Sequence, residues 1–376
     1  MRAGPSVARR GVALVGIAVS ACSSGGPTAP RDRITVTGYV ERGATVSVAY
    51  MRGGTAVAPT SVTWSGTPAS AITISADGIA HLTDTGAVTI TGQDGKSSAS
   101  VIVHVAAPPT IFFDLQDSGG QGNRDVYSMA LDGGALTRLS SGTGDNEQPA
   151  PVGGVVIFTS FRDGYAALYT VANTGGLETR LAGIPAPSSQ ASVSADGSTL
   201  AFISPLNGGD HLWASAIDGS NPIAVAGAAG FSTALQASPS WSPSRDTLVV
   251  VTTQYGNASL ARLAVAEGSE SSLTDGATTD VNPAWSPDGT TVAFVSTRDG
   301  DVAIFAYTIS TAAIQRLSPT PANVAEPAWL VDGRIVFTSA VGTTTQLRWM
   351  DPAHPDTGTV IPTPTGGNPR RAVRAG

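Results

Sequence analysis

The sequence predicts an all-β protein of two domains, an N-terminal β-sandwich and a six-bladed β-propeller that the C-terminal strand closes. Three observations predict this fold class. Apolar and polar residues alternate in short runs over residues 33–106, which is typical of strands with one buried face. From residue 107 to residue 376 one pattern recurs about every 44 residues, which is the signature of a repeat architecture. Gly and Pro, with 44 and 25 residues, separate the runs as turn signals.

Composition limits the kind of protein. The 376 residues include 21 Lys and Arg against 28 Asp and Glu, a formal net charge of −7, so we expect no nucleic acid partner. Hydrophobic residues make up 41% of the chain, which is enough to bury the cores of two domains. The single Cys excludes an intrachain disulfide, so the cores must hold without a covalent link.

The N-terminus has the features of an export signal. Residues 1–21 contain three Arg and then a short apolar run, residues 11–18, that is too short to span a membrane. The run leads to Val19-Ser-Ala-Cys22, which resembles a bacterial lipobox. The resemblance implies acylation of Cys22 and a lipid anchor in the cell envelope, at the outer membrane or the cell surface, on the periplasmic or extracellular face. The alternative is an ordinary signal peptide followed by a chance Cys.

Residues 33–106 predict a small β-sandwich behind a flexible tether, residues 22–32, that is rich in Ser, Gly and Pro. Trp64 is expected to fill its core. The pieces Val62-Thr-Trp-Ser65 and Gly86-Ala-Val-Thr-Ile-Thr91 make the segment similar to the group 2 bacterial immunoglobulin-like domain. That resemblance implies a spacer or an adhesive module.

The repeat of residues 107–376 is clearest at Pro283-Ala-Trp-Ser-Pro-Asp-Gly289, which is followed by a strand and by Arg298-Asp-Gly300. Its first position, which we call the anchor, recurs at residues 149, 191, 239, 283 and 327. A sixth anchor is expected at Pro369, close to the end of the chain, whereas the strands just after residue 107 have none. These two incomplete ends predict one shared blade, so the C-terminal strand would close the ring.

The repeat motif is similar to the WD-like repeat of TolB-type propellers. The resemblance covers about residues 110–374 and implies a propeller that binds a protein or peptide partner. TolB itself carries a small α/β domain before its propeller, where this chain has the predicted immunoglobulin-like segment. We expect the recurring Trp241, Trp285 and Trp329 to pack between blades.

A polar residue precedes each anchor, and we expect these residues to meet at one mouth of the central channel. They are Gln148, Gln190, Ser238, Asn282, Glu326 and Asn368. Residues expected close to them are Glu147, Gln236, Asp280, Arg162 and Arg298. We interpret the set as a candidate site for a polar ligand or a peptide. The alternative is that these side chains bond backbone groups between blades, since buried polar atoms must be paired.

Motifs for catalysis and metal binding are absent from the sequence. The four His are widely spaced, and neither a His-Glu-x-x-His motif nor a Cys pair occurs, so no zinc site is expected. A Gly-x-Ser-x-Gly motif is also missing. Asp280, Glu326 and Glu147 are the candidates for the paired carboxylates of a glycosidase. We expect no cofactor and no enzymatic activity.

The sequence therefore predicts a lipid-anchored binding or scaffold protein outside the cytoplasm, whose non-catalytic propeller contacts a protein or a peptide. Two alternatives stay open. One is a propeller that binds or cleaves a glycan, and the other is a structural or adhesive surface protein.

Overall fold

The structure, a computed structural model, describes residues 32–374 apart from 96, 117–121, 207, 226–234, 245, 266–268, 320–321, 356–357 and 365. Over these residues the chain consists of β-strands and their connections, and a short 3₁₀ turn at Pro59–Ser61 is the one helical element. The prediction of an all-β protein is confirmed. Within the same ranges no helix is long and apolar enough to cross a bilayer. The expected signal peptide and Cys22 lie outside the described residues.

The chain divides into two compact units, residues 1–108 and 109–376. The division lies two residues beyond the boundary expected from the sequence. Each hydrophobic cluster draws its residues from one unit, so each unit has cores of its own. The units are described separately below.

The first unit consists of two antiparallel sheets. One sheet has the order β1-β2-β6-β5, with β3 paired to β2, and the other has the order β4-β7-β8. Its strands are β1 (Arg33–Thr37), β2 (Thr45–Arg52), β3 (Thr55–Ala56), β4 (Thr63–Thr67), β5 (Ile72–Ile74), β6 (Ile79–Leu82), β7 (Gly86–Asp94) and β8 (Ser97–Val105).

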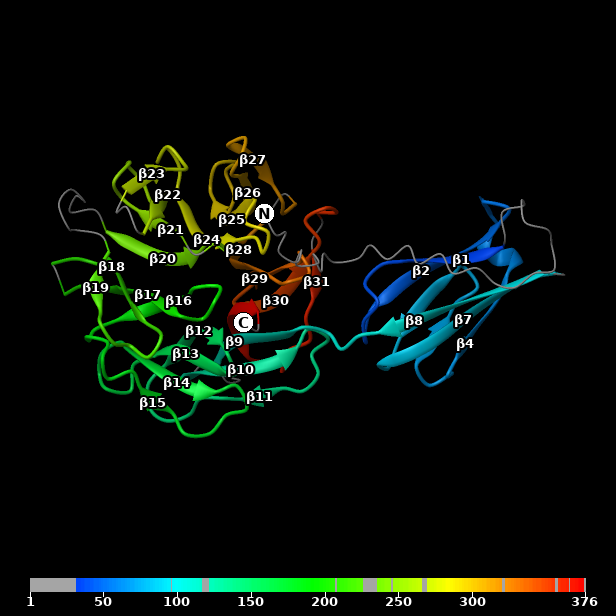
Figure 1. The fold of residues 1–376 in the computed structure, drawn as a ribbon, viewed down its shortest axis with the longest axis horizontal. Coiled ribbons are helices and arrows are strands. Elements are labelled where there is room, and N and C mark those ends of the chain that lie inside the picture. The colour runs from blue at the N-terminus through cyan, green and yellow to red at the C-terminus, as the bar shows by residue number, and fades with distance from the viewer. Residues whose placement is uncertain are drawn as a thin grey trace, which may run out of the picture. The chain divides into compact units, whose positions relative to one another are not determined.

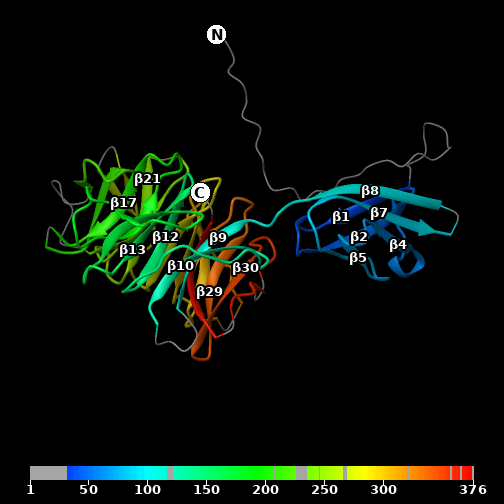
Figure 2. The same ribbon diagram turned by 90° about the horizontal axis from the view of Figure 1, so that it is seen from below.

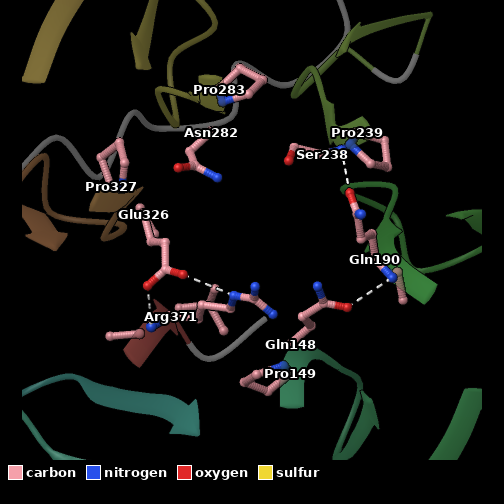
Figure 3. Close-up of a pocket in the computed structure, with 14 residues that line it drawn as sticks. Gln148, Pro149, Gln190, Ser238, Pro239, Asn282, Pro283, Glu326, Pro327 and Arg371 are labelled. Carbon is pink, nitrogen blue, oxygen red and sulfur yellow. Dashed lines mark hydrogen bonds and ion pairs between the residues drawn. The ribbon is translucent and has the colours of Figure 1, made fainter. Parts of the chain in front are cut away.

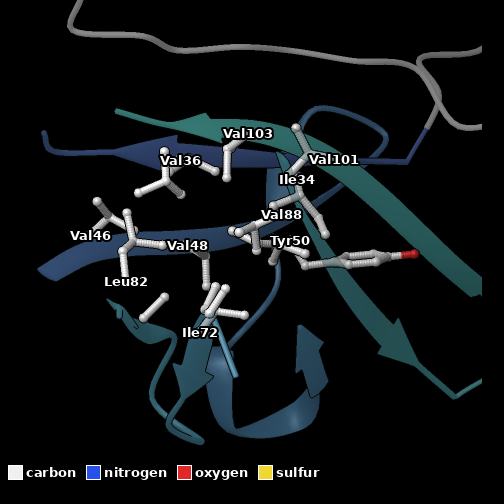
Figure 4. Close-up of a cluster of buried hydrophobic side chains, with 14 of the residues drawn as sticks. Ile34, Val36, Val46, Val48, Tyr50, Ile72, Leu82, Val88, Val101 and Val103 are labelled. Carbon is white, nitrogen blue, oxygen red and sulfur yellow. The ribbon is translucent and has the colours of Figure 1, made fainter. Parts of the chain in front are cut away.

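The core of this unit lies between the two sheets, where apolar side chains of alternate strand positions meet (Figure 4). In β8, for example, Ala99, Val101, Val103 and Val105 are buried, and the residues between them face away from the core. Tyr50 is fully buried and is the largest side chain of the cluster. Trp64, which was expected to fill the core, is only partly buried and packs against the cluster. None of the five residues of β4, which lies at the edge of its sheet, is fully buried.

The second unit contains, in the residues that the structure describes, six antiparallel sheets of four strands each, which we number blades 1 to 6. Blade 1 consists of β32 (Asn368–Arg374), β9 (Thr110–Gln116), β10 (Arg124–Ala130) and β11 (Thr137–Arg138), and blade 2 of β12 (Asn146–Val152), β13 (Val155–Ser160), β14 (Ala167–Ala172) and β15 (Thr179–Arg180). Blade 3 consists of β16 (Ser189–Val193), β17 (Thr199–Ser204), β18 (His211–Ala216) and β19 (Ile223–Ala224), and blade 4 of β20 (Gln236–Trp241), β21 (Thr247–Thr252), β22 (Ser259–Ala264) and β23 (Ser269–Ser272). Blade 5 consists of β24 (Asp280–Trp285), β25 (Thr291–Ser296), β26 (Ala303–Thr308) and β27 (Ala313–Arg316), and blade 6 of β28 (Val324–Trp329), β29 (Ile335–Val341), β30 (Thr344–Met350) and β31 (Thr359–Val360).

The six blades form a closed ring. Each inner strand contacts the inner strand of the next blade, from β12 through β16, β20, β24 and β28 to β32, and β32 contacts β12 again. The last strand, β32, pairs antiparallel with β9, so the C-terminal segment supplies the inner strand of blade 1. In both ribbon views the red β32 lies beside β9 and near the orange β29 and β30 (Figure 1, Figure 2).

Tryptophans tie the inner strands together. The indole N–H of Trp241 donates to the Ser192 carbonyl oxygen of the preceding blade at 3.2 Å, and that of Trp329 donates to the Ala284 carbonyl oxygen at 3.1 Å. Trp285 occupies the same position in blade 5, but its indole nitrogen has no hydrogen-bond partner among the described residues. All three pack against apolar side chains of neighbouring blades, as expected from their recurrence.

Candidate functional site

A β-bulge interrupts each inner strand at the same place. In blade 2 the register with β13 shifts between Glu147 and Ala150, and the other five blades show the same shift at the corresponding residues. The first bulged residue always has a positive φ, between 49° and 58°, although none of the six is glycine. Bulges re-aim side chains, and positive φ is uncommon in residues with a Cβ atom. In each blade this unusual backbone conformation therefore turns one side chain away from the direction that a regular strand would give it.

These six side chains meet around the channel and form what we call the mouth ring. Its members are Gln148, Gln190, Ser238, Asn282, Glu326 and Arg371. They surround a cavity of about 220 Å³, whose other walls are the anchors and their neighbours (Figure 3). All six are half-buried. The structure thus brings together five of the six residues that the sequence placed before an anchor.

Asn368 is not part of the mouth ring, so the expected position of the sixth anchor is wrong. The bulge of β32 lies between Arg370 and Val373, which makes Ala372 the sixth anchor and Arg371 the ring residue. Pro369 matched the repeat spacing, and Pro stands at four of the other five anchors. Asn368 instead begins β32, where its Oδ1 accepts a hydrogen bond from the Thr345 backbone N–H at 3.3 Å.

Three members of the mouth ring bond the next blade. The Gln148 Oε1 accepts a hydrogen bond from the Gln190 backbone N–H at 3.1 Å, and the Gln190 Oε1 accepts one from the Ser238 backbone N–H at 2.5 Å. Glu326 repeats this link, since its Oε2 accepts from the Arg371 backbone N–H at 2.9 Å. Each link joins the side chain of one ring residue to the backbone of the ring residue that follows.

The other three positions of the ring make no such link. Ser238 has a side chain too short to reach the next blade, and Asn282 is one methylene shorter than Gln148 and Gln190. Arg371 carries only donors and cannot accept from an N–H. In Figure 3 the Asn282 amide points into the opening, and no hydrogen bond joins it to the residues drawn. Among the described residues the ring therefore lacks this link between blades 4 and 5, between blades 5 and 6, and between blades 1 and 2. The first two gaps are adjacent, and we call them the open side of the ring.

Arg371 pairs with both carboxylates of the mouth. Its Nε lies 2.9 Å from the Glu326 Oε1, and its Nη1 lies 3.3 Å from the Glu147 Oε1. Burial lowers the pKa of Arg371, but Glu147, Glu326 and Asp114 together raise it by more, so the net pKa is raised. The guanidinium is thus fixed by the protein's own carboxylates.

A buried aspartate, Asp114, lies in β9, the strand that pairs with the closing strand β32. It was not among the residues predicted from the sequence. Asp114 in β9 is 1% exposed, and its Oδ2 accepts a hydrogen bond from the Arg124 Nη1 at 2.7 Å. Its Oδ1 has no hydrogen-bond partner among the described residues. Burial raises the pKa of Asp114 to about 7, against the smaller opposing effect of Arg124. The sequence signal was a carboxylate inside the apolar run Thr110–Gln116, at a position where the other blades have no acid.

Gln236 and Asp280 do not reach the mouth. Both lie two residues before a ring residue, in the regular part of the strand, and both are buried. The Gln236 Oε1 accepts a hydrogen bond from the Leu212 backbone N–H at 2.9 Å. The Asp280 Oδ1 lies 3.0 Å from the Arg298 Nη2. Gln236 therefore links blade 4 to blade 3, and Asp280 binds the hairpin between β25 and β26.

Arg162 and Arg298 hold their hairpins and do not line the mouth. The Nε of Arg162 donates to the Ser160 Oγ at 2.8 Å, and the Nε of Arg298 donates to the Ser296 Oγ at 2.9 Å. The Arg162 guanidinium lies 4.5 Å from the centre of the Tyr169 ring, and that of Arg298 lies 5.1 Å from the centre of the Phe305 ring. Such cation–π contacts, with the bonds to Ser, explain the repeat of Arg at this hairpin position.

The channel widens beyond the anchors. A second cavity of about 530 Å³ has the anchor prolines in common with the first and continues to Trp241, Trp285, Trp329 and the turn at Asp196. In the described ranges no group of three or more His, Cys, Asp or Glu side chains is arranged to hold a metal ion. The two cavities are lined by the polar ring residues, by Pro, Ala and Val side chains of the inner strands, and by the three tryptophans.

Comparisons with known proteins show which families and solved structures resemble this chain. Residues 223–370 match the TolB beta propeller domain family. No curated protein matches the chain. Among solved structures, TolB from Acinetobacter baumannii has a TM-score of 0.63 at 16% identity, covering 84% of this chain and 83% of its own. A putative TolB from Agrobacterium tumefaciens has a TM-score of 0.52 at 15% identity, covering 68% and 88%.

A solved structure that does not carry the TolB name shares this fold as well. One chain of a nidogen/laminin complex has a TM-score of 0.55 at 12% identity, covering 71% of this chain and 98% of its own. At such identities the solved structures share the fold alone. The second unit is therefore a β-propeller of the TolB kind in its fold, and over residues 223–370 it is similar in sequence to the TolB beta propeller domain.

Proposed function

We propose that this chain is a non-catalytic binding protein of the cell envelope, whose propeller contacts a protein or peptide partner at the mouth ring. The observation that carries the proposal is the convergence of one re-aimed polar side chain from each blade on a single cavity. Non-glycine residues at positive φ cost stability, and such strain gathers at functional sites. The similarity to TolB-type propellers supports the same conclusion.

The state of the carboxylates supports a non-catalytic role. Glycosidases need one carboxyl group that donates a proton and a second that is free to act as nucleophile or base. Glu147 and Glu326 are both paired with Arg371, and Asp280 is buried against Arg298. None of the three candidates is presented to the channel as a free acid or base.

The proposal also assigns roles to Cys22 and to the first unit. Cys22 would carry the lipid that anchors the protein, and the first unit would act as an immunoglobulin-like spacer between the anchor and the propeller. The lipobox-like Val19-Ser-Ala-Cys22 supports the anchor, and the two sheets that enclose one core support the spacer.

The test is capture of a partner by the full chain from cross-linked envelopes of the source cells, with the mouth open or blocked. Asn282→Trp fills the cavity without breaking a side-chain link of the ring, and Leu177→Trp places the same ring on an 89% exposed position as a control. We expect a protein that wild type and Leu177→Trp capture equally and that Asn282→Trp loses at least about tenfold. Equal capture by all three would contradict binding at the mouth. Retention of an oligosaccharide in place of a protein would favour the glycan alternative.

A further inference from the structure

The open side of the mouth ring has a specific chemistry. Gln190, Ser238 and Arg371 each donate their backbone N–H to the side chain of the preceding ring residue. Asn282 and Glu326 have the same bulge and the same positive φ, 52° and 57°, so their N–H groups have the same direction. Among the described residues no side chain accepts from either of them. Two adjacent backbone N–H groups of the ring therefore lack the side-chain acceptor that their counterparts have.

The side chains between these donors complete the arrangement. Ser238 and Asn282 follow one another around the opening, and the Asn282 amide points into it (Figure 3). An amide offers one acceptor and two donors, and a hydroxyl offers both functions. We call Ser238, Asn282 and the Glu326 backbone the open arc. It can accept hydrogen bonds through the Ser238 and Asn282 side-chain oxygens and donate several to a ligand group in the cavity of about 220 Å³.

Charge excludes some ligands from the open arc. The charged side chains of the described residues at the mouth are Glu147, Glu326 and Arg371, and the buried pair of Asp114 and Arg124 lies within electrostatic reach of them. A carboxylate in the arc would lie beside Glu326 and be repelled. An ammonium group would find both Glu326 oxygens already bonded, to Arg371 and to the Thr338 hydroxyl. A neutral amide matches the donors through its carbonyl and the Asn282 oxygen through its N–H.

We propose that the open arc is the subsite for a neutral amide of a protein partner, either an Asn or Gln side chain or a main-chain peptide group. The inference rests on the proposed function, because it names the group that a protein partner would insert into the mouth. Its physical basis is side-chain length: Gln and Glu close a link of the ring, whereas Ser and Asn leave the next N–H for a ligand.

The first experiment tests whether the donors are open. Amide hydrogen exchange of the full chain, followed by NMR, should be faster at Asn282 and Glu326 than at Gln190, Ser238 and Arg371. Ser238→Gln with Asn282→Gln should slow exchange at Asn282 and Glu326 at least about tenfold, because the longer side chains reach the next blade. Gln190→Asn, the reverse change, should speed exchange at Ser238. Equal protection of all five amides in wild type would overturn the inference.

The second experiment tests the ligand class with small probes. N-acetylglycinamide should shift the Asn282 and Glu326 amide resonances of wild type, and the Ser238→Gln, Asn282→Gln variant should lose these shifts. Sodium acetate should shift them less. Larger shifts with acetate would overturn the choice of a neutral group, and shifts with N-acetylglucosamine alone would overturn the choice of a peptide amide.

The capture experiment then separates this inference from the proposed function. Ser238→Gln with Asn282→Gln should reduce capture at least about tenfold, whereas Leu177→Gln, which adds the same side chain at an exposed position outside the mouth, should retain it. If Asn282→Trp abolishes capture and the double Gln variant does not, the inference fails and the proposed function stands. If neither variant changes capture, the proposed function fails, and the probe shifts decide separately whether the subsite exists.

Discussion

One residue per blade combines two properties, a positive φ and a polar side chain that turns toward the channel. The residue two positions earlier belongs to a regular strand, which is why Asp280 and Gln236 are buried while Asn282 and Ser238 line the mouth. Pro at the anchor marks most of the ring residues in the sequence. Arg371 could not be found this way because its anchor is Ala372, and only the backbone reveals the bulge.

Asp114 should make the stability of the propeller depend on pH. Between its ordinary pKa of 3.8 and the native pKa of about 7, the folded chain keeps a proton that the unfolded chain has lost. Stability therefore falls as pH rises through this range, by at most about 1.4 kcal/mol per pH unit for one group. Asp114→Asn cannot titrate and still offers an oxygen to Arg124, so its stability should lack this decline. Urea unfolding at several pH values between about 4 and 8 measures it, and parallel curves for the two proteins would contradict the assignment.

Arg298 should be important for stability and not for binding. Removing it leaves the fully buried Asp280 without its positively charged partner. Breaking a buried ion pair in this way lowers the free energy of unfolding by on the order of 3 kcal/mol. We expect Arg298→Ala to lower the free energy of unfolding by about that amount and Asp280→Asn to restore part of it in the same chain. Denaturant unfolding of the two single variants and the double variant measures this coupling. If the losses of the two single variants add up in the double variant, the pair is not coupled. If Arg298→Ala keeps full stability but loses capture of the partner, Arg298 belongs to the binding site.

At the scale of elements, the repeat predicted the strands well and the closing strand imprecisely. Apolar runs identify the second strand of a blade, as in Val155–Ser160, Thr199–Ser204 and Thr291–Ser296, because burial on both faces requires continuous apolar residues. The inner strands carry the anchor motif, and their pairing follows from it. In β32 the anchor lies three residues later than expected. The repeat spacing predicts Pro369, but the bulge lies between Arg370 and Val373, which makes Ala372 the anchor.

Deletion of residues 367–376 should destabilise the whole propeller. It removes β32, which bonds β9 and contacts β12 and β28, and it leaves the edge of β9 exposed to other chains. We expect the melting temperature to fall by more than about 10 °C, with aggregation detected by light scattering. Arg370→Ala, an exposed change in the same strand, is the matched control and should have little effect. An unchanged melting temperature of the deleted chain would contradict closure by β32.

At the scale of the whole molecule, we propose a different role for each unit: the first unit is a spacer, and the propeller binds the partner. The first unit has one core between two sheets, and the second repeats a blade until the ring closes. Both architectures were predictable because alternation and repeat length are properties of the sequence itself. The ligand was not, because the mouth depends on which of six equivalent side chains are long enough to bond their neighbours.

The proposed place of the molecule in the cell depends on Cys22. Acylation of its thiol would bury fatty chains in a bilayer at about 0.8 kcal/mol per CH₂ group, which anchors a protein firmly when several chains are present. Cys22→Ser removes the thiol that a lipobox requires, so the variant should leave the membrane fraction and take up no labelled fatty acid. Cys22→Ala should behave in the same way, and Ser23→Ala, next to the site, should keep the label. Fatty acid on the Cys22→Ser chain would contradict this anchor and would remove the reason for a spacer between membrane and propeller.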